Sequence, residues 1–210
     1  MKIYGNDLGL DSLGLYNLKN VHRNLSVSEL VDDIVNNNEG LIGLRGAAMV
    51  DTGIYTGRSP QDKYIVDEPS SNEKLWWGPV NKKISEDIFD LLYGKITDYY
   101  NSTDHTKTYV FDGFAGADPN YSLNVRIIAK KAWQAHFVNN MFIRPKNGEL
   151  DEFKPGFTII NASDVSNERF DDFGMNSETF IIFHMEKRIA IIGGTEYGGE
   201  MKKGIFSVLH

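Results

Sequence analysis

Apolar residues recur along this chain at two spacings, one typical of helices and one typical of short buried strands. A helix is predicted to follow Ser85, which can cap it, and to end near Tyr100, because apolar residues recur at helical spacing: Ile84, Ile88, Leu91, Leu92 and Ile96. The run Ser26-Val27-Ser28-Glu29 has the form of a capping box and predicts a short helix through about Asn36. Residues 132–143 carry bulky side chains on most faces, which predicts a well-buried helix.

Short apolar runs bounded by turn residues predict strands. We expect strands at 63–66, 108–111, 123–129, 157–160, 179–184 and 189–192, and a strand, loop and strand over 41–52. Glu186 and Lys187 separate the last two runs and suggest a hairpin. Residues 69–79 and 113–119 are expected to be loops. The pattern predicts an α/β fold of α+β type, in which helices flank a mixed β-sheet.

Composition limits the classes of protein to which the chain can belong. At 210 residues it suits one domain, residues 1–210. The absence of cysteine excludes disulfides and thiolate zinc sites, and agrees with a cytoplasmic protein. The net charge of −7 argues against a nucleic-acid partner. No apolar run approaches the roughly 20 residues that span a bilayer, so we expect no membrane partner.

The most informative segment is residues 193–206, GGTEYGGEMKKGIF. Its glycines let the backbone approach a ligand closely, and the hydroxyl of Tyr197 can donate to an oxyanion. Lys202 and Lys203 are adjacent, so each disfavours charge on the other and one pKa is expected to fall. Such a lysine can act as a base, a nucleophile or a metal ligand. The alternative interpretation is a glycine-rich turn with two solvated lysines.

A second segment places Arg58 between Gly57 and Ser59, on a tight turn before a strand. The planar guanidinium of such an arginine can bind a carboxylate or a phosphate. The alternative is a loop arginine paired with Asp51 or Asp62. A fold that gathers at least three of the cations Arg58, Lys63, Arg126, Lys202 and Lys203 would form a small positive basin suited to a dianion.

Three segments together resemble the ATP-dependent phosphoenolpyruvate carboxykinases: residues 56–66 (TGRSPQDKYIV), 133–145 (WQAHFVNNMFIRP) and 193–206. The similarity runs from about residue 41 to the end of the chain. The resemblance implies a gluconeogenic enzyme that converts oxaloacetate and ATP to phosphoenolpyruvate, CO2 and ADP. The family's phosphate loop has no counterpart here, because no G-x-x-x-x-G-K-[ST] occurs. We therefore expect an N-terminal substrate-binding domain, inactive alone, whose partner is the missing C-terminal nucleotide-binding domain.

The resemblance also implies roles for five residues. Arg58 would hold a substrate carboxylate. Tyr197 would donate its hydroxyl to the substrate, or place its ring edge against the carboxylate or the released CO2, and Gly199 would let backbone N–H groups come close. Lys203 would bind Mn²⁺ as a deprotonated amine beside the substrate, and Lys202 would stay charged and neutralise substrate or phosphate. Both lysines are candidate catalytic residues, with Mn²⁺, Mg²⁺ and ATP as the implied cofactors. The alternative function is a stand-alone, non-catalytic module that binds small dicarboxylates.

Other candidates have less specific interpretations. His136 is expected to be a hydrogen-bonded core histidine rather than a ligand. Arg126 is expected either in a buried ion pair or behind the site. Asp51 and Asp112 follow predicted strands, where we expect loop geometry or pairing with Arg58 rather than catalysis.

The chain also departs from the family pattern at two positions. Gln61 stands where many relatives have lysine, which weakens the local positive field. Glu196 precedes Tyr197 where some relatives have tryptophan.

Overall fold

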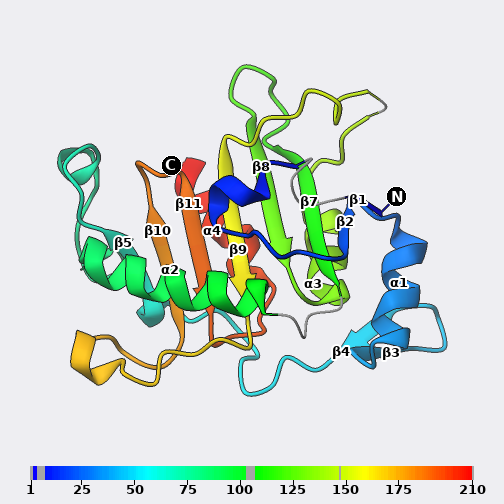
Figure 1. The fold of residues 1–210 in the computed structure, drawn as a ribbon, viewed down its shortest axis with the longest axis horizontal. Helices are drawn as coiled ribbons and strands as arrows, with labels where there is room; N and C mark the ends of the chain where they lie inside the picture. The colour runs from blue at the N-terminus through cyan, green and yellow to red at the C-terminus, as the bar shows by residue number, and fades with distance from the viewer. Residues whose placement is uncertain (1, 4–7, 103–106, 147, 210) are drawn as a thin grey trace.

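A mixed β-sheet forms the centre of the molecule (Figure 1). The computed structural model describes residues 2–3, 8–102, 107–146 and 148–209. Within them the sheet has nine strands, in the spatial order β1 (Lys2–Ile3), β2 (Val21–Arg23), β7 (Thr108–Ala115), β8 (Leu123–Ala129), β9 (Phe157–Ala162), β11 (Ile189–Gly193), β10 (Phe180–His184), β5 (Lys63–Val66) and β6 (Lys82–Ile84). The sheet contains both parallel and antiparallel pairs, so the predicted mixed sheet is confirmed.

Helices cover both faces of this sheet. Helix α2 (Glu86–Asn101) lies across one face, while α3 (Ala132–Met141) and α4 (Gly199–Leu209) pack on the other. Helix α1 (Val27–Asn36) packs against α3 and against the small hairpin of β3 (Gly40–Ile42) and β4 (Ala48–Val50). Short 3₁₀ turns occur at Leu10–Leu13, Pro60–Asp62, Asn72–Lys74 and Asp171–Phe173. No helix in the described part of the chain combines the length and apolar character needed to cross a bilayer.

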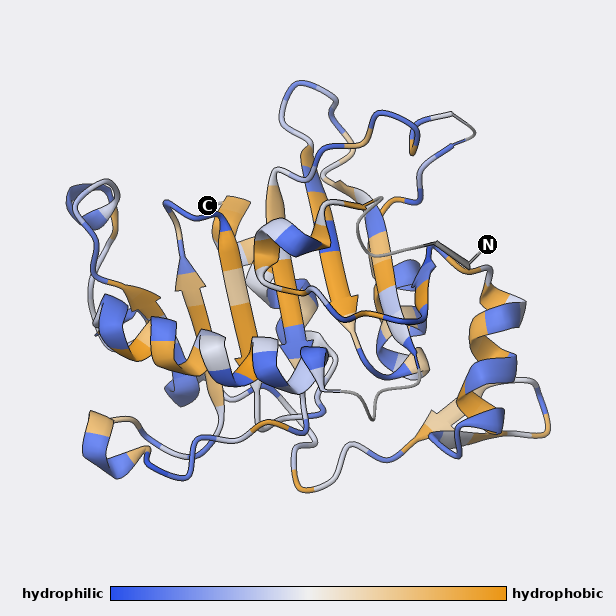
Figure 2. Cartoon of the chain, in the orientation of Figure 1, coloured by the Kyte–Doolittle hydropathy of each residue, from blue (hydrophilic) through white to orange (hydrophobic). Residues whose placement is uncertain are grey.

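Two of the three apolar cores in the described residues lie on opposite faces of the sheet, because side chains alternate along the strands, and the third lies between α1 and α3. In β8, Ile128 packs in the core under α2, whereas its neighbour Ile127 packs in the core under α4. Figure 2 shows the central strands as almost uninterrupted hydrophobic segments, because both of their faces are covered.

Most predicted elements are confirmed, several to the residue. Ser26 and Glu29 form the capping box of α1, and Ser85 accepts a hydrogen bond from the Ile88 N–H at the start of α2. Residues 63–66 and 123–129 form β5 and β8 as predicted, and β10 and β11 form the predicted hairpin.

The predicted loop at 113–119 begins three residues too early. Strand β7 continues through Ala115, because Gly113 pairs with Val125 in β8. Phe114 also forms a bridge with Ile143, and the predicted helix at 132–143 accordingly stops at Met141.

Candidate active site

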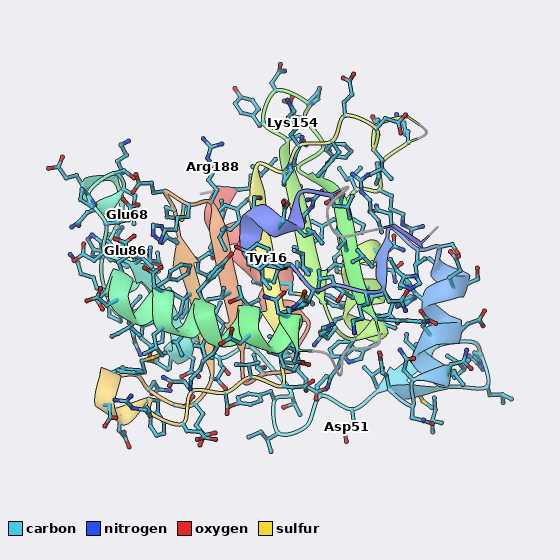
Figure 3. All side chains as sticks on the ribbon, in the orientation of Figure 1. Tyr16, Asp51, Glu68, Glu86, Lys154 and Arg188 are labelled. Carbon is cyan, nitrogen blue, oxygen red and sulfur yellow. The ribbon has the colours of Figure 1, made fainter. Side chains whose placement is uncertain are left out.

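The candidate site residues gather at one edge of the sheet. Strands β8, β9 and β11 are parallel, so their carboxyl ends share this edge. After β11 the chain turns at Gly194 (φ 70°), where a Cβ would lie 3.0 Å from the carbonyl oxygen of Glu178, and then enters α4. The loop after β4 reaches the same edge, and Figure 3 shows Asp51 on it, at the opposite end of the molecule from Arg188.

Tyr197 is positioned by the glycines that follow it. A Cβ at Gly199 would lie only 2.4 Å from Cε1 of Tyr197, so the ring lies directly over the first residue of α4. Gly198 faces α3, where a Cβ would be 3.1 Å from the Phe137 ring. The Tyr197 N–H donates to Thr195 Oγ1 at 3.1 Å. Within the described residues the half-buried Tyr197 hydroxyl makes no hydrogen bond, so it is available to a ligand.

Arg58 lies on a loop attached to α4. The Ser59 N–H donates to Glu200 Oε1 at 2.6 Å, across 141 residues of sequence. Arg58 itself is exposed and forms no hydrogen bond or ion pair with any described residue.

The two acids considered as partners of Arg58 are occupied elsewhere. Asp51 accepts the Gly53 N–H at 2.8 Å, which is the loop geometry expected of it. Asp62 accepts from Asn176 at 2.8 Å and Ser177 at 2.9 Å. The interpretation of Arg58 as an ordinary paired loop arginine is therefore wrong.

The two lysines lie on successive positions of α4, about 100° apart around the helix. Lys202 is exposed, while Lys203 is half-buried with its Nζ 4.8 Å from the centroid of the Phe206 ring. Both line a pocket of about 180 Å³, whose apolar walls include Ile143 and Ile205. Arg58 and Tyr197 are not among the residues that line this pocket.

Lys203 can supply at most one ligand to a metal ion. No group of three His, Cys, Asp or Glu side chains suited to a metal occurs in the part of the chain that the structure describes. Mn²⁺ and Mg²⁺ prefer octahedral sets of oxygen ligands, so a single amine cannot hold either ion alone. The described residues therefore offer one candidate ligand, the Lys203 amine, and the remaining ligands would have to come from elsewhere.

Sequence reasoning did not single out Glu200, which links these segments. Its side chain is 6% exposed, although it lies in the first turn of α4. Burial raises the pKa of its carboxyl, while the hydrogen bond from Ser59 and the charges of Arg58 and Lys63 oppose the rise. An acid in a first helical turn is usually explained by the helix dipole, so its position in the sequence did not indicate burial.

Lys63 adds a second positive charge near Arg58. Burial lowers the pKa of Lys63, and the charge of Arg58 lowers it further. Its ammonium donates to Asn81 at 3.1 Å and to Ser207 in α4 at 3.3 Å. Of the three or more cations that the predicted basin requires, these interactions bring together two, Arg58 and Lys63.

Arg126 lies outside this basin. It forms a two-pronged pair with Asp112, its cross-strand partner in β7, at 2.7 and 2.8 Å, and Arg23 also contacts Asp112 at 2.7 Å. Of the two roles considered for Arg126, the buried ion pair is the one found. The expectation that Asp112 adopts loop geometry or pairs with Arg58 is wrong, because Asp112 lies within β7 and is fully buried between two other arginines.

The neighbouring polar residues have structural partners. Glu196 pairs with Lys131 at 2.5 Å, and Lys131 also reaches Asp164 at 3.3 Å, which fixes the segment just before Tyr197. His136 is half-buried and lies 3.4 Å from the side-chain amide of Asn140. Burial lowers the His136 pKa, as does nearby Arg144. His136 therefore has a hydrogen-bond partner as predicted, but it is half-buried rather than part of the core.

Comparison with known proteins identifies the family of the chain. A sequence model of the ATP-dependent phosphoenolpyruvate carboxykinase family, described as phosphoenolpyruvate carboxykinase, matches residues 19–210. The chain belongs to this family. A phosphoenolpyruvate carboxykinase (ATP) of Leptospira biflexa is 52% identical over all 210 residues, which is 100% of this chain and 39% of that protein.

Two further phosphoenolpyruvate carboxykinases (ATP) show similar agreement. The protein of Campylobacter lari is 49% identical over 202 residues, 96% of this chain and 38% of the relative. That of Geobacillus kaustophilus is 49% identical over 190 residues, 90% of this chain and 35% of the relative. The chain therefore spans under two fifths of the length of these phosphoenolpyruvate carboxykinases.

Proposed function

We propose that this chain is the substrate-binding part of an ATP-dependent phosphoenolpyruvate carboxykinase, a gluconeogenic carboxy-lyase of the cytoplasm. The whole protein would convert oxaloacetate and ATP to phosphoenolpyruvate, CO2 and ADP. This chain would supply the binding site for oxaloacetate and phosphoenolpyruvate together with one metal ligand. The rest of the same protein would form a nucleotide-binding domain that completes the active site, so these 210 residues alone would not turn over.

The proposal rests mainly on the exposure of Arg58 and on the absence of a partner for its guanidinium among the described residues. Its guanidinium is exposed and unpaired among the described residues, while its loop is fixed to α4 by the bond between Ser59 and Glu200. A fixed loop with a free guanidinium is suited to a planar carboxylate, which arginine binds with two parallel hydrogen bonds. Tyr197 lies two residues before α4 and Gly199 is its first residue, at the edge of the sheet where β11 ends.

The donors at this edge of the sheet are suited to the negative charges that the substrate carries and develops during the reaction. Loss of CO2 from oxaloacetate leaves an enolate, whose oxygen then accepts the γ-phosphoryl group. Arg58 would orient the substrate by the carboxylate that is retained. The Tyr197 hydroxyl and the N–H of Gly199, which as the first residue of α4 has no partner within the helix, could donate to the developing oxyanion.

The lysines would act on the other side of the reacting centre. Lys203 in its neutral form would bind Mn²⁺, with the remaining ligands coming from the rest of the protein. When bound, the metal ion would stabilise negative charge on the substrate and phosphoryl oxygens. Lys202, exposed and cationic, would neutralise a substrate or phosphate oxygen. ATP and its Mg²⁺ would bind mainly outside this chain.

The surface around the lysine pocket supports contact with a further domain. Four apolar residues beside the pocket are 41–52% exposed: Met141, Ile143, Phe206 and Leu209. Such a surface is larger than scattered single residues and suits an interdomain contact.

The test is an assay of the complete protein from the source gene. With oxaloacetate, ATP, Mg²⁺ and Mn²⁺ it should form phosphoenolpyruvate and CO2, and the 210-residue chain should form neither. A complete protein that binds dicarboxylates without forming phosphoenolpyruvate would contradict the proposal and would favour a non-catalytic binding module.

A further inference from the structure

We propose that Glu200 is the positioning residue that holds the Arg58 loop in its substrate-binding place. The inference rests on the proposed function, because it gives Glu200 a role in holding the loop whose Arg58 would bind the substrate carboxylate. Glu200 would not contact substrate. It would act through the backbone of Ser59, next to Arg58.

The bond between Ser59 and Glu200 has no substitute in its segment. Within the described residues, it is the one hydrogen bond that joins residues 56–59 to a distant part of the fold. The remaining bond of this segment is local, from the Asp62 N–H to the Ser59 carbonyl at 3.0 Å. A Cβ at Gly57 would meet nothing within 4 Å, so no described group packs against that side of the turn. Losing the Glu200 acceptor would therefore free Arg58 to move.

The anchors on either side of this segment lie too far along the chain to replace it. Tyr55 contacts Thr179 by a hydrogen bond of 2.5 Å between their hydroxyls, three residues before Arg58. Asp62 is held by Asn176 and Ser177, four residues after it. Between these anchors Lys82 Nζ donates to the Gln61 carbonyl at 2.6 Å, three residues after Arg58. Among the described residues, Glu200 is the one side chain that accepts from an N–H of the loop between Tyr55 and Asp62.

Glu200 also connects the loop to the rest of the site. Its own N–H donates to the Tyr197 carbonyl at 3.2 Å. On α4 it lies one turn before Lys203, on the same side of the helix. One side chain thus sets the distance between the candidate carboxylate-binding arginine and the segment with Tyr197 and Lys203.

Kinetics of two Glu200 variants separate a positioning role from a purely structural one. Glu200→Gln keeps an oxygen at Oε1 that can accept from Ser59, and Glu200→Ala removes it. In the complete protein, the alanine variant should raise the KM for oxaloacetate on the order of tenfold, as expected for loss of one charge-assisted hydrogen bond. The KM for ATP should not change, and the glutamine variant should restore the oxaloacetate KM to within a few fold of the wild type.

Hydrogen exchange of the 210-residue chain tests the contact without relying on activity. The Ser59 amide should exchange on the order of tenfold faster in Glu200→Ala than in wild type or Glu200→Gln. Glu186→Ala, which removes an exposed carboxylate in the turn between β10 and β11, is the matched control and should leave Ser59 unaffected. If the alanine variant does not fold, Glu200→Asp, whose carboxylate is shorter by one methylene, replaces it.

An unchanged Ser59 exchange rate without the acceptor would overturn the inference, and so would an unchanged oxaloacetate KM in an active Glu200→Ala protein. A Glu200→Gln variant as impaired as Glu200→Ala would also overturn it, because charge rather than the accepted hydrogen bond would then matter. Failure of the proposed function appears separately, as a wild-type complete protein that forms no phosphoenolpyruvate.

Discussion

The ring of Tyr197 lies over Gly199 so closely that an added Cβ would come within 2.4 Å of its Cε1 atom. Gly199→Ala should therefore displace the ring while leaving its hydroxyl chemically intact. In the complete protein we expect the oxaloacetate KM to rise about tenfold, the size of one lost hydrogen bond to a charged group.

The matched control is Gly94→Ala in α2, where an added Cβ meets nothing within 4 Å. Alanine there should leave the KM unchanged and stabilise the helix by up to about 1 kcal/mol. Equal kinetics in the two variants would show that the position of the Tyr197 ring does not matter for substrate binding.

Replacing Lys203 and replacing Lys202 should have different effects on the dependence of the rate on Mn²⁺. Lys203→Ala in the complete protein should reduce kcat and weaken the dependence of the rate on Mn²⁺ concentration, because a metal ligand is lost. Lys202→Ala should leave the apparent affinity for Mn²⁺ closer to wild type, since its amine is proposed to act as a charge. Rate measurements across a Mn²⁺ titration separate the two, and an unchanged kcat in Lys203→Ala would refute its assigned role.

Removing the buried charge of Asp112 should lower the stability of the fold. Asp112 is 0% exposed and accepts from both Arg126 and Arg23. Asp112→Ala leaves two arginines without their buried partner, so the free energy of unfolding should fall by about 3–5 kcal/mol in urea denaturation.

An exposed ion pair provides the comparison for Asp112. Asp67→Ala removes the partner of Lys83 on the surface and should cost about 0–1 kcal/mol. A similar small loss for both variants would mean that Asp112 does not stabilise the sheet.

Lys130 predicts a dependence of stability on pH. Burial lowers the pKa of its amine from 10.5 to about 8, so between these values the unfolded chain binds more protons than the folded chain. The free energy of unfolding should therefore gain a contribution that rises with pH from about 8 toward 10.5. Tyr100, whose pKa burial raises well above 10.0, acts in the opposite direction only at higher pH.

The measurement is thermal or urea unfolding between about pH 7.5 and 9.5, below the range in which tyrosines ionise. Lys130→Met should show a weaker rise with pH than the wild type and should be more stable at pH 7.5. The remaining slope would come partly from Lys63, whose pKa is also lowered. Identical slopes in the two proteins would contradict the assignment.

Most helices and strands could be predicted from the sequence, because capping motifs and apolar spacing depend on residues that are close together in the chain. The capping box of Ser26 and Glu29 and the cap of Ser85 are short-range features, and both are present in the structure. Strands β2 and β6 were not predicted. Each has three residues, and it forms by pairing with β7 or β5 rather than through a pattern of its own.

The candidate site shows the same division. Arg58, Tyr197 and the lysines stand in unusual local runs, so the sequence alone singled them out. Glu200 lies in the same segment as Tyr197 and the lysines, but the sequence did not indicate its role. That role depends on a hydrogen bond to Ser59, 141 residues away. The pairing of Arg126 with Asp112 likewise depends on the register between β7 and β8.

The most direct test of the account is the KM for oxaloacetate of the complete protein with Arg58 replaced. Arg58→Lys keeps the charge but loses the planar fork, so we predict a KM about 10–100-fold above wild type, with Arg58→Ala at least as impaired and the KM for ATP unchanged. An oxaloacetate KM equal to wild type in both variants would show that Arg58 does not hold the substrate carboxylate.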